Sequence, residues 1–373
     1  MVSTYASYKL ITRDIDTAIS RVEKQPTVKR ETEYFLANIG NVKSVDEFVS
    51  NTRLFKYAMK AFNLEDMAYA KAFMKKALNE GLSDPDSFAN KLTDKRYAEF
   101  VKAFNFAAYG EDATTYVAAR DATVKNYMSR ATGDGLFPPT ESAKQETAYF
   151  ETNIGKVQSI DDLLDDARLL DYALRAFNLE KETFSRAQLF DILSGGTTDP
   201  DSPANKHSNE NVKKFAAAFD FATLGEKTTT YVAARDLTAS KYARQTLEEN
   251  AGNENEGVRL ALYFQRKAAD IKNYYAILGD SALSKVVRTA LGLPDAIANA
   301  DVDQQVKLLQ KKFDIEDFQD PKKVEKFLAR FTTMWEIENP TTSVQSLTLS
   351  LFNNSNSFGI SPDTMLAIAT LKR

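Results

Sequence analysis

The chain has 373 residues, of which 43% are hydrophobic and 27% are charged, and 48 basic residues nearly balance 52 acidic ones. This composition is typical of globular domains and excludes a disordered or collagen-like chain. There is no cysteine and a single histidine, which excludes disulfide frameworks, thiolate zinc sites, cysteine nucleophiles and histidine-rich metal sites. The net charge of −4 argues against a protein that binds nucleic acid through bulk electrostatics.

The amino-terminal residues contain no apolar run that resembles the core of a signal peptide, because charges recur from Lys9 onward. No stretch approaches the roughly 18 consecutive apolar residues of a membrane-spanning helix. We therefore expect no membrane span. Two locations stay open at this point, the cytoplasm and export without a cleavable signal peptide.

From Glu31 onward the sequence repeats itself. Residues 31–121 align with residues 146–236 at a constant offset of 115 without a gap, and 44 of the 91 aligned positions are identical. A period of this length exceeds the roughly 20–50 residues of a solenoid repeat and matches the size of one small domain. The sequence therefore predicts a tandem duplication of a helical bundle domain.

Within the first copy, apolar residues recur every three or four positions from Val45 to Phe62, which predicts one amphipathic helix. Ser44, followed three residues later by Glu47, predicts a capping box at its start. Three further helices are expected: 66–79, 94–109 ended by Gly110, and 114–131 capped by Thr114. Because alternation with a period of two is scarce, the predicted fold class is all-α, with four or five helices in each copy.

An acidic loop separates the second and third of these helices. The loop Asp84–Asn90 and its counterpart Asp199–Asn205 each offer carboxylate and amide oxygens that could hold a calcium ion. However, a calcium loop requires a glycine and a glutamate at the positions where this loop has Ala89 and Lys95. We favour the interpretation that Asp84 caps a helix that begins at the following proline.

One octapeptide, Thr114–Asp121, recurs unchanged as Thr229–Asp236. One interpretation is a docking face built by Tyr116, Arg120 and the aspartate beside it. We favour the other interpretation, a capped helix in which Tyr116 and Val117 fill the core and Arg120 pairs locally.

His207 lies in a polar stretch of the second copy at the position where the first copy has Leu92. We do not expect a catalytic residue at an unmatched loop position, so we predict a surface histidine. Tyr34-Phe35 and its repeats are interpreted as core anchors. Neither a phosphate-binding glycine loop nor a Gly-x-Ser-x-Gly elbow occurs, and no carboxylate pair stands out for acid–base catalysis. We therefore predict no catalytic, cofactor-binding or metal-ligating residues.

A third, degraded copy follows the second. Tyr263-Phe264 matches Tyr149-Phe150 in spacing, Ala290–Leu293 matches Ala176–Leu179, and Phe327 and Phe331 match Phe215 and Phe219. The octapeptide has no third counterpart, and a different tail begins near Asn339. In that tail Ser346–Phe352 predicts a strand and Ser361 begins a short helix. We favour a tail that folds back onto the third copy over one that adds to a partner subunit.

The predicted domains follow from the repeat. They are the first copy with an N-terminal helix (1–132), the second copy (133–250), the degenerate third copy (251–340) and the C-terminal tail (341–373). Polar, glycine-containing linkers are expected at 133–139 and 248–257.

Several segments together resemble the alphaproteobacterial family grouped as "domain of unknown function 1217". These segments are Tyr5–Ile11, Gln25–Phe35, Ala61–Leu64, Asp84–Leu92 and Thr115–Val117. Members of that family are often encoded beside flagellar genes. The resemblance therefore implies a role in flagellar assembly or motility, a flagellar component as the protein partner, and export to the flagellum as the alternative to a cytoplasmic location. It brings no catalytic residues with it.

We expect a non-enzymatic structural or interaction protein, because duplicated helical domains offer repeated surfaces to a partner and multiply weak contacts. The alternative is a cytoplasmic enzyme, or a protein that binds a small ligand or ion at a site between the repeated domains, where ligands are commonly found. No cofactor is expected.

Overall fold

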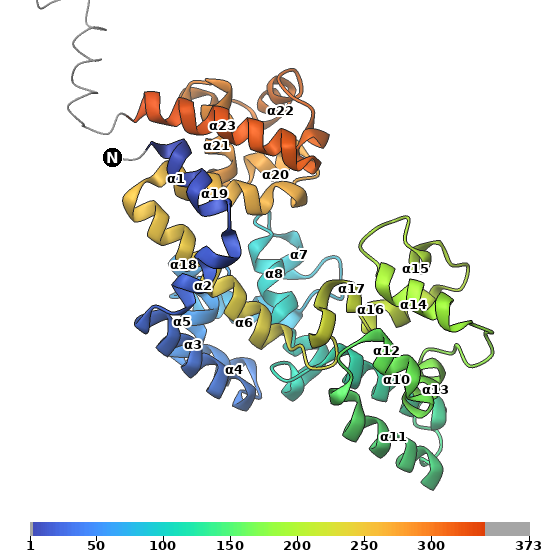
Figure 1. The fold of residues 1–373 in the computed structure, drawn as a ribbon. Helices are drawn as coiled ribbons and strands as arrows, with labels where there is room; N and C mark the ends of the chain where they lie inside the picture. The colour runs from blue at the N-terminus through green and yellow to red at the C-terminus, as the bar shows by residue number, and fades with distance from the viewer. Residues whose placement is uncertain (1–2, 340–373) are drawn as a thin grey trace, which may run out of the picture. The chain divides into compact units, whose positions relative to one another are not determined.

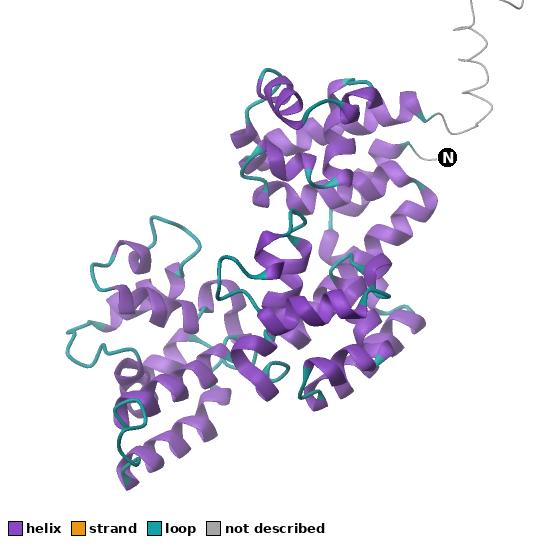
Figure 2. Cartoon of the chain, turned by 180° about the vertical axis from the view of Figure 1, so that it is seen from behind, coloured by secondary structure: helices purple, strands orange, loops and turns teal. Residues whose placement is uncertain are grey.

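The computed structural model describes residues 3–339, so the predicted strand and helix of the tail lie outside the described residues. Over that range every regular element is a helix and no strand occurs, which confirms the predicted fold class (Figure 2). None of the helices in this part of the chain combines the length and the hydropathy needed to cross a membrane.

The chain forms two compact units. One unit is Glu23–Gln245 and holds the two gap-free copies. Among the described residues, the other joins 3–22 with 246–339, and it holds the third copy. The N-terminal helix, which the sequence grouped with the first copy, therefore belongs to the unit of the third copy.

The unit of the two copies repeats its helices as well as its residues (Figure 1). The first copy contains α3 (Pro26–Asn38), α4 (Val45–Ser50), α5 (Thr52–Ala61), α6 (Lys71–Glu80), α7 (Phe88–Lys91), α8 (Arg96–Ala103), α9 (Phe106–Tyr109) and α10 (Thr123–Ala131). The second copy contains α11 (Glu141–Asn153), α12 (Ile160–Asp165), α13 (Ala167–Ala176), α14 (Arg186–Gly195), α15 (Pro203–Lys206), α16 (Glu210–Ala218), α17 (Phe221–Leu224) and the start of α18 (Thr238–Glu254). In six pairs both helix bounds are shifted by 115 residues: α3/α11, α4/α12, α5/α13, α6/α14, α7/α15 and α9/α17.

Two of the predicted helices are each broken in two. The predicted helix 45–62 is α4 and α5, because the side chain of Asn51 accepts a backbone hydrogen bond and caps α5. The predicted helix 94–109 is α8 and α9, and Asn105 caps α9 in the same way. The buried stripe stays in phase across each break, so periodicity alone predicted continuous helices. The expected helix 66–79 is α6, which follows the short turn η2 (Glu65–Met67).

The octapeptide does not begin a helix at Thr114, contrary to the prediction. The hydroxyl of Thr114 is buried and donates to the carbonyl oxygen of Val42 (3.0 Å), and the matching threonine of the second copy makes the same bond (2.8 Å). The helix begins four residues later, with the π-helical turn η4 (Ala118–Ala122). The Asp121 carboxylate accepts a hydrogen bond from the backbone N–H of Val117 (2.7 Å), which places the capping carboxylate inside the turn.

The helix that follows each octapeptide packs in the opposite copy. We call this helix, α10 or the start of α18, the exit helix. In Figure 1 α10 lies with α11 and α13, and its Tyr127 ring stacks on Tyr172 of α13 at 3.9 Å between centroids. In the reverse direction Tyr242 of α18 stacks on Tyr57 of α5 at 3.8 Å. Ala119 of the first octapeptide also lies in the buried core of the second copy. Each copy therefore completes its core with the exit helix of the other.

The tyrosines that receive the exit helices are fixed from the opposite side. The hydroxyl of Tyr57 hydrogen-bonds Thr32 (2.9 Å), and that of Tyr172 hydrogen-bonds Thr147 (2.9 Å). Burial raises the pKa of both phenols. A buried hydroxyl without a partner is costly, so the threonine on α3 or α11 sets where each ring stands.

The unit of the third copy contains α1 (Thr4–Thr12), α19 (Glu256–Lys267), α20 (Tyr274–Leu278), α21 (Ser281–Leu291), α22 (Val302–Gln310) and α23 (Pro321–Glu338), with α2 (Ile15–Glu23) and α18 leading to the other unit. Helix α1 packs on α19 and α23 and buries Tyr8 in their core. The backbone N–H of Thr4 donates to Glu336 (3.0 Å), and its hydroxyl accepts from Asn255 (2.9 Å). These contacts explain why the N-terminal helix groups with the third copy.

The third copy keeps the geometry around its second long helix, α21. The hydroxyl of Tyr263 donates to Asp280, the N-cap of α21, just as Tyr149 donates to Asp166 at the start of α13. The chain leaves α5, α13 and α21 through a residue with positive φ: Asn63 (56°), Asn178 (57°) and Gly292 (63°). The degraded sequence therefore retains the start and the end of this helix.

The predicted linker 248–257 is formed by the end of α18 and the start of α19, which meet at Asn255, while 133–139 is an irregular connection. Glu248 lies within α18, where it is buried and pairs with Arg266 (2.8 Å). A buried carboxylate is stable only with such a partner. The polar composition that suggested a linker therefore reflects a buried ion pair as well as exposed residues.

Candidate functional site

The acidic loops are turns, and they do not cap a helix as predicted. The carboxylate of Asp84 accepts a hydrogen bond from the backbone N–H of Asp86 (2.8 Å), and Asp199 makes the same bond to Asp201 (2.8 Å). The helix that follows begins later, at Phe88 of α7 in the first copy. A carboxylate that bonds the backbone two residues on forms a local turn, which competes with a helix start.

Two further side chains of the acidic loop make contacts within it. The side chain of Asn90 donates to the carbonyl oxygens of Leu82 (3.1 Å) and Asp84 (2.8 Å), so it braces the loop. Asp86 is exposed and pairs with Lys91 at 3.3 Å. Among residues 3–339 no group of three or more histidine or acidic side chains could hold a metal ion. The loop therefore closes on itself through its own backbone.

His207 is half-buried in a turn of the second copy. Its Nδ1 accepts a hydrogen bond from the backbone N–H of Asn209 (3.1 Å), and its ring lies 5.9 Å from that of Phe184. Leu92 takes the equivalent place in the first copy. These contacts are those of a turn-forming residue.

In the octapeptide, Arg120 pairs with its neighbour, Asp121, at 2.6 Å, and the second copy repeats this pair at 2.9 Å. This local pair and the burial of Val117 agree with the favoured interpretation. Tyr116 differs from it, because the ring is only half-buried and stacks on Tyr109 at 3.7 Å between centroids.

Tyr116 lines a cleft of about 770 Å³ between the first and second copies. Seven pairs of equivalent positions face it: Lys102/Ala217, Ala103/Ala218, Asn105/Asp220, Tyr109/Leu224, Ala113/Thr228, Tyr116/Tyr231 and Ala118/Ala233. The cleft therefore lies between matching surfaces of the two copies. The sequence suggested a site between the repeated domains, but of the residues that line this cleft it singled out only Tyr116. The others could not be predicted, because a sequence does not show which surfaces of the two copies face each other.

The tyrosines of the cleft are neutral hydrogen-bonding groups at ordinary pH. Burial, and then the nearby Tyr109, raise the pKa of Tyr116. Burial and the carboxylate of Asp236 raise the pKa of Tyr231 to about 12. Both phenols can therefore donate a hydrogen bond to an acceptor in the cleft.

A second repeated feature, which we call the Glu–Arg–Tyr cluster, lies on the surface of each copy. In the first copy the Arg53 guanidinium lies 3.6 Å from the Tyr34 ring centroid, and its Nε donates to Glu31 (2.8 Å). In the second copy Arg168 lies 3.9 Å from Tyr149 and donates to Glu146 (2.8 Å). The tyrosine predicted as a core anchor is thus only half-buried, while the phenylalanine after it is fully buried.

The arginines of the Glu–Arg–Tyr clusters are accessible, with side-chain exposures of 42% for Arg53 and 45% for Arg168. The hydrogen bond from Arg53 lowers the pKa of Glu31, which keeps the carboxylate charged. The third copy has Leu260 and Ala282 at the corresponding positions and so lacks the cluster.

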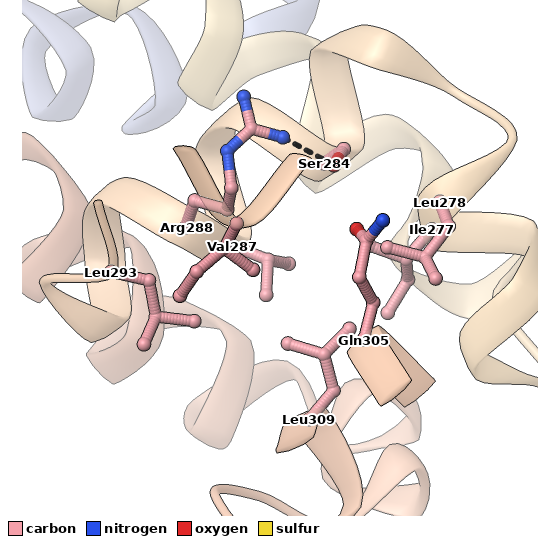
Figure 3. Close-up of a pocket in the computed structure, with 9 residues that line it drawn as sticks. Ile277, Leu278, Ser284, Val287, Arg288, Leu293, Gln305 and Leu309 are labelled. Carbon is pink, nitrogen blue, oxygen red and sulfur yellow. Dashed lines mark hydrogen bonds between the residues drawn. The ribbon is translucent and has the colours of Figure 1, made fainter. Parts of the chain in front are cut away.

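The third copy has a small cavity of its own (Figure 3). Its walls are mainly aliphatic, and two of its polar side chains are hydrogen-bonded: Nη1 of Arg288 donates to Ser284 (2.6 Å), and Gln305 donates to the carbonyl oxygen of Ala300 (2.8 Å). The Nε of Arg288 is buried without a hydrogen-bond partner among the described residues. The cavity volume of about 10 Å³ holds at most one water molecule. This cavity is a packing defect and cannot take a substrate.

Comparison with known proteins agrees with the repeat. The model of the family described as "Protein of unknown function (DUF1217)" matches residues 61–174 and 176–324, and the two matches begin 115 residues apart. The X-ray crystal structure of a protein from Agrobacterium tumefaciens is 36% identical over 91% of this chain and 98% of that chain, with a TM-score of 0.53. The curated proteins gave no match. The chain therefore belongs to the DUF1217 family.

Proposed function

We propose that this protein is a non-enzymatic interaction protein that offers the same surface twice, once from each gap-free copy. The observation that carries the proposal is the Glu–Arg–Tyr cluster, which has the same three residues, the same Glu–Arg and Arg–Tyr contacts and a similar arginine exposure in both copies. Buried repeated residues are explained by packing alone. An exposed repeated cluster is what a partner that contacts both copies would require.

The chemistry of the cluster suits protein recognition. Arginine and tyrosine are enriched among the residues that dominate binding energy. In the first copy Glu31 accepts hydrogen bonds from Nε and Nη2 of Arg53, which holds the guanidinium over the Tyr34 ring. A guanidinium has five N–H donors, so donors remain for a carboxylate or carbonyl of the partner. The cluster therefore fits a partner surface that carries acidic or carbonyl acceptors.

Two identical sites can bind a repetitive partner with much higher avidity than one, provided that both sites reach it together. An assembled polymer of identical subunits is such a partner. The family background, in which members are often encoded beside flagellar genes, makes a flagellar component the partner that we propose, with a role in flagellar assembly or motility.

The first test is deletion of the gene in the bacterium that encodes it, followed by measurement of swimming speed and of filament number by electron microscopy. We expect slower swimming or fewer filaments, restored by the wild-type gene. Unchanged motility and filaments in the deletion strain would refute the flagellar role.

The second test complements that strain with the R53A, R168A and double variants. If both clusters bind together, the double variant should fail to complement, whereas each single variant keeps partial function. The control is R175A, which removes an exposed arginine (52%) whose one ion pair within residues 3–339 is with Asp171 on its own helix. Full complementation by the double variant, with normal protein levels, would refute the docking role of the clusters.

A further inference from the structure

We infer that the cleft between the first and second copies binds a small planar aromatic molecule that carries an anionic group. This inference is independent of the proposed docking role, because the Glu–Arg–Tyr clusters do not line the cleft. Three properties of the cleft support it: its size, the unlike nature of its two walls, and the charge left available in it.

The size of the cleft fits a small molecule. Ligand pockets typically measure about 300–1,000 Å³, and the cleft measures about 770 Å³. Such pockets are mainly apolar, with a few polar groups that orient the ligand. Here alanine methyl groups from both copies and larger side chains such as Phe62 and Leu237 form the apolar part, and the phenols of Tyr116 and Tyr231 are among the polar groups.

The two walls differ although they derive from equivalent positions. On the wall of the first copy Tyr109 stacks on Tyr116 with a centroid distance of 3.7 Å and an interplanar angle of 11°. Tyr109 is 37% exposed, so its ring retains surface for a further contact. On the other wall Leu224 replaces Tyr109. The cleft therefore offers an aromatic surface from the first copy and an aliphatic one from the second, and an aromatic surface favours a planar ring as its ligand.

The charged groups that line the cleft leave one cation available. Lys241 pairs with Glu99 at 3.0 Å, and Asp220 accepts a backbone hydrogen bond at the start of α17. Lys102 is exposed, and within residues 3–339 it has no ion pair of 4 Å or less. The second copy has Ala217 at the same position, so this positive charge belongs to one wall only. An anionic substituent on the ring is therefore expected to lie near Lys102.

The test uses two fluorescent dyes with the full-length protein. Anilinonaphthalene sulfonate is aromatic and anionic, and N-phenylnaphthylamine is its neutral counterpart. We expect both dyes to bind with one site per chain, and the A217W variant, which fills the cleft from an exposed position, to abolish binding of both. Far-UV circular dichroism of each variant confirms that it is folded.

Two further variants separate the ring from the charge. K102A should weaken binding of the sulfonate dye about fivefold, which is the change in affinity expected when an exposed ion pair is lost. It should leave binding of the neutral dye unchanged. Y109A should weaken both dyes about tenfold through lost stacking, whereas its matched control L224A should change binding by only about twofold.

Each contrary result overturns a stated part of the inference. Dye binding that survives A217W places the dyes elsewhere and refutes the site. Equal effects of K102A on both dyes refute recognition of the anionic group. Equal effects of Y109A and L224A refute the aromatic wall. None of these outcomes bears on the motility test of the arginine clusters, so failure of one proposal leaves the other standing.

Discussion

The two gap-free copies and the degraded third copy differ in which features they keep. All three retain a residue with positive φ after the same helix. The second and third copies also share a tyrosine that hydrogen-bonds the N-cap of that helix. Only the first two have the octapeptide and the exchanged exit helices. The identity of the octapeptide in the first two copies is therefore explained by the exchange of the exit helices. Each octapeptide leads into a helix that must fit an equivalent surface in the other copy. A copy without a reciprocal partner has no such requirement.

The largest expected effect comes from separating the two copies. A fragment of residues 23–131 lacks α18, which supplies Tyr242 to its core, so we do not expect it to form a folded monomer. Fragment 23–245 should fold, and mixing 23–131 with 132–245 should restore helicity. Circular dichroism with analytical ultracentrifugation measures both. A cooperatively folded monomer of 23–131 would show that the exchange is dispensable.

Substitution of the residue that packs against the exit helix compares the second copy with the third copy directly. Tyr172 packs between Tyr127 (3.9 Å) and Phe150 (4.4 Å), so Y172A should cost about 3–4 kcal/mol in the free energy of unfolding. The corresponding residue of the third copy is Val286, and V286A should cost about 2 kcal/mol. Urea denaturation, fitted unit by unit, measures the difference. Equal costs would mean that the exit helix adds little at this site.

The control for that comparison is Y172F, which keeps the ring and removes only the hydroxyl that hydrogen-bonds Thr147. We expect a cost of about 1 kcal/mol. A cost as large as that of Y172A would assign the effect to the hydrogen bond instead of the stacking.

The position with positive φ that all three copies share should be sensitive to substitution, which is expected to lower the free energy of unfolding. At Gly292, where φ is +63°, G292A should cost about 1 kcal/mol, because a Cβ disfavours this conformation. The matched control is G155A, a glycine without positive φ and with open space around it, which should change stability by at most about 0.5 kcal/mol. Thermal unfolding distinguishes them, and equal effects would remove the conformational explanation.

The smallest expected effect concerns pH and one capping box. The carboxylate of Asp162 accepts backbone hydrogen bonds from Gln158 and Ser159, and these bonds lower its pKa below the ordinary 3.8. A lowered folded-state pKa stabilises the protein above pH 3.8, and the stabilisation is lost as the pH falls through the folded value. The difference between wild type and D162N should therefore be present at neutral pH and vanish in acid. A difference that does not change with pH would refute the linkage.

The sequence allowed the fold class, the repeat and most helix positions to be predicted, because helical periodicity and duplication are local or directly visible. The breaks at Asn51 and Asn105 were missed, since the buried stripe continues across them. The prediction that Asp84 and Thr114 each cap a helix is wrong, and the reason is the same for both residues. A short polar side chain can cap a helix or bond a turn equally well in sequence terms, and the surrounding backbone decides.

The exchange and the cleft could not be predicted from residue patterns. An amphipathic helix shows that it buries one face, but it does not show which of two equivalent cores receives that face. The cleft residues follow from the same choice, since Tyr116 and Tyr231 line one cleft only when the copies pair. The members of the Glu–Arg–Tyr cluster could have been found in the sequence, because its glutamate, tyrosine and arginine are identical in the two aligned copies.

The exchanged exit helices also bear on how the gene arose. A protein with a single copy would carry an exit helix that cannot pack in its own core. That core would in turn lack the helix that completes it. Two identical molecules would satisfy both needs by trading helices, so the ancestor of the present chain is best understood as a homodimer. Fusion of two such genes would then have made an association that depended on concentration into a permanent one.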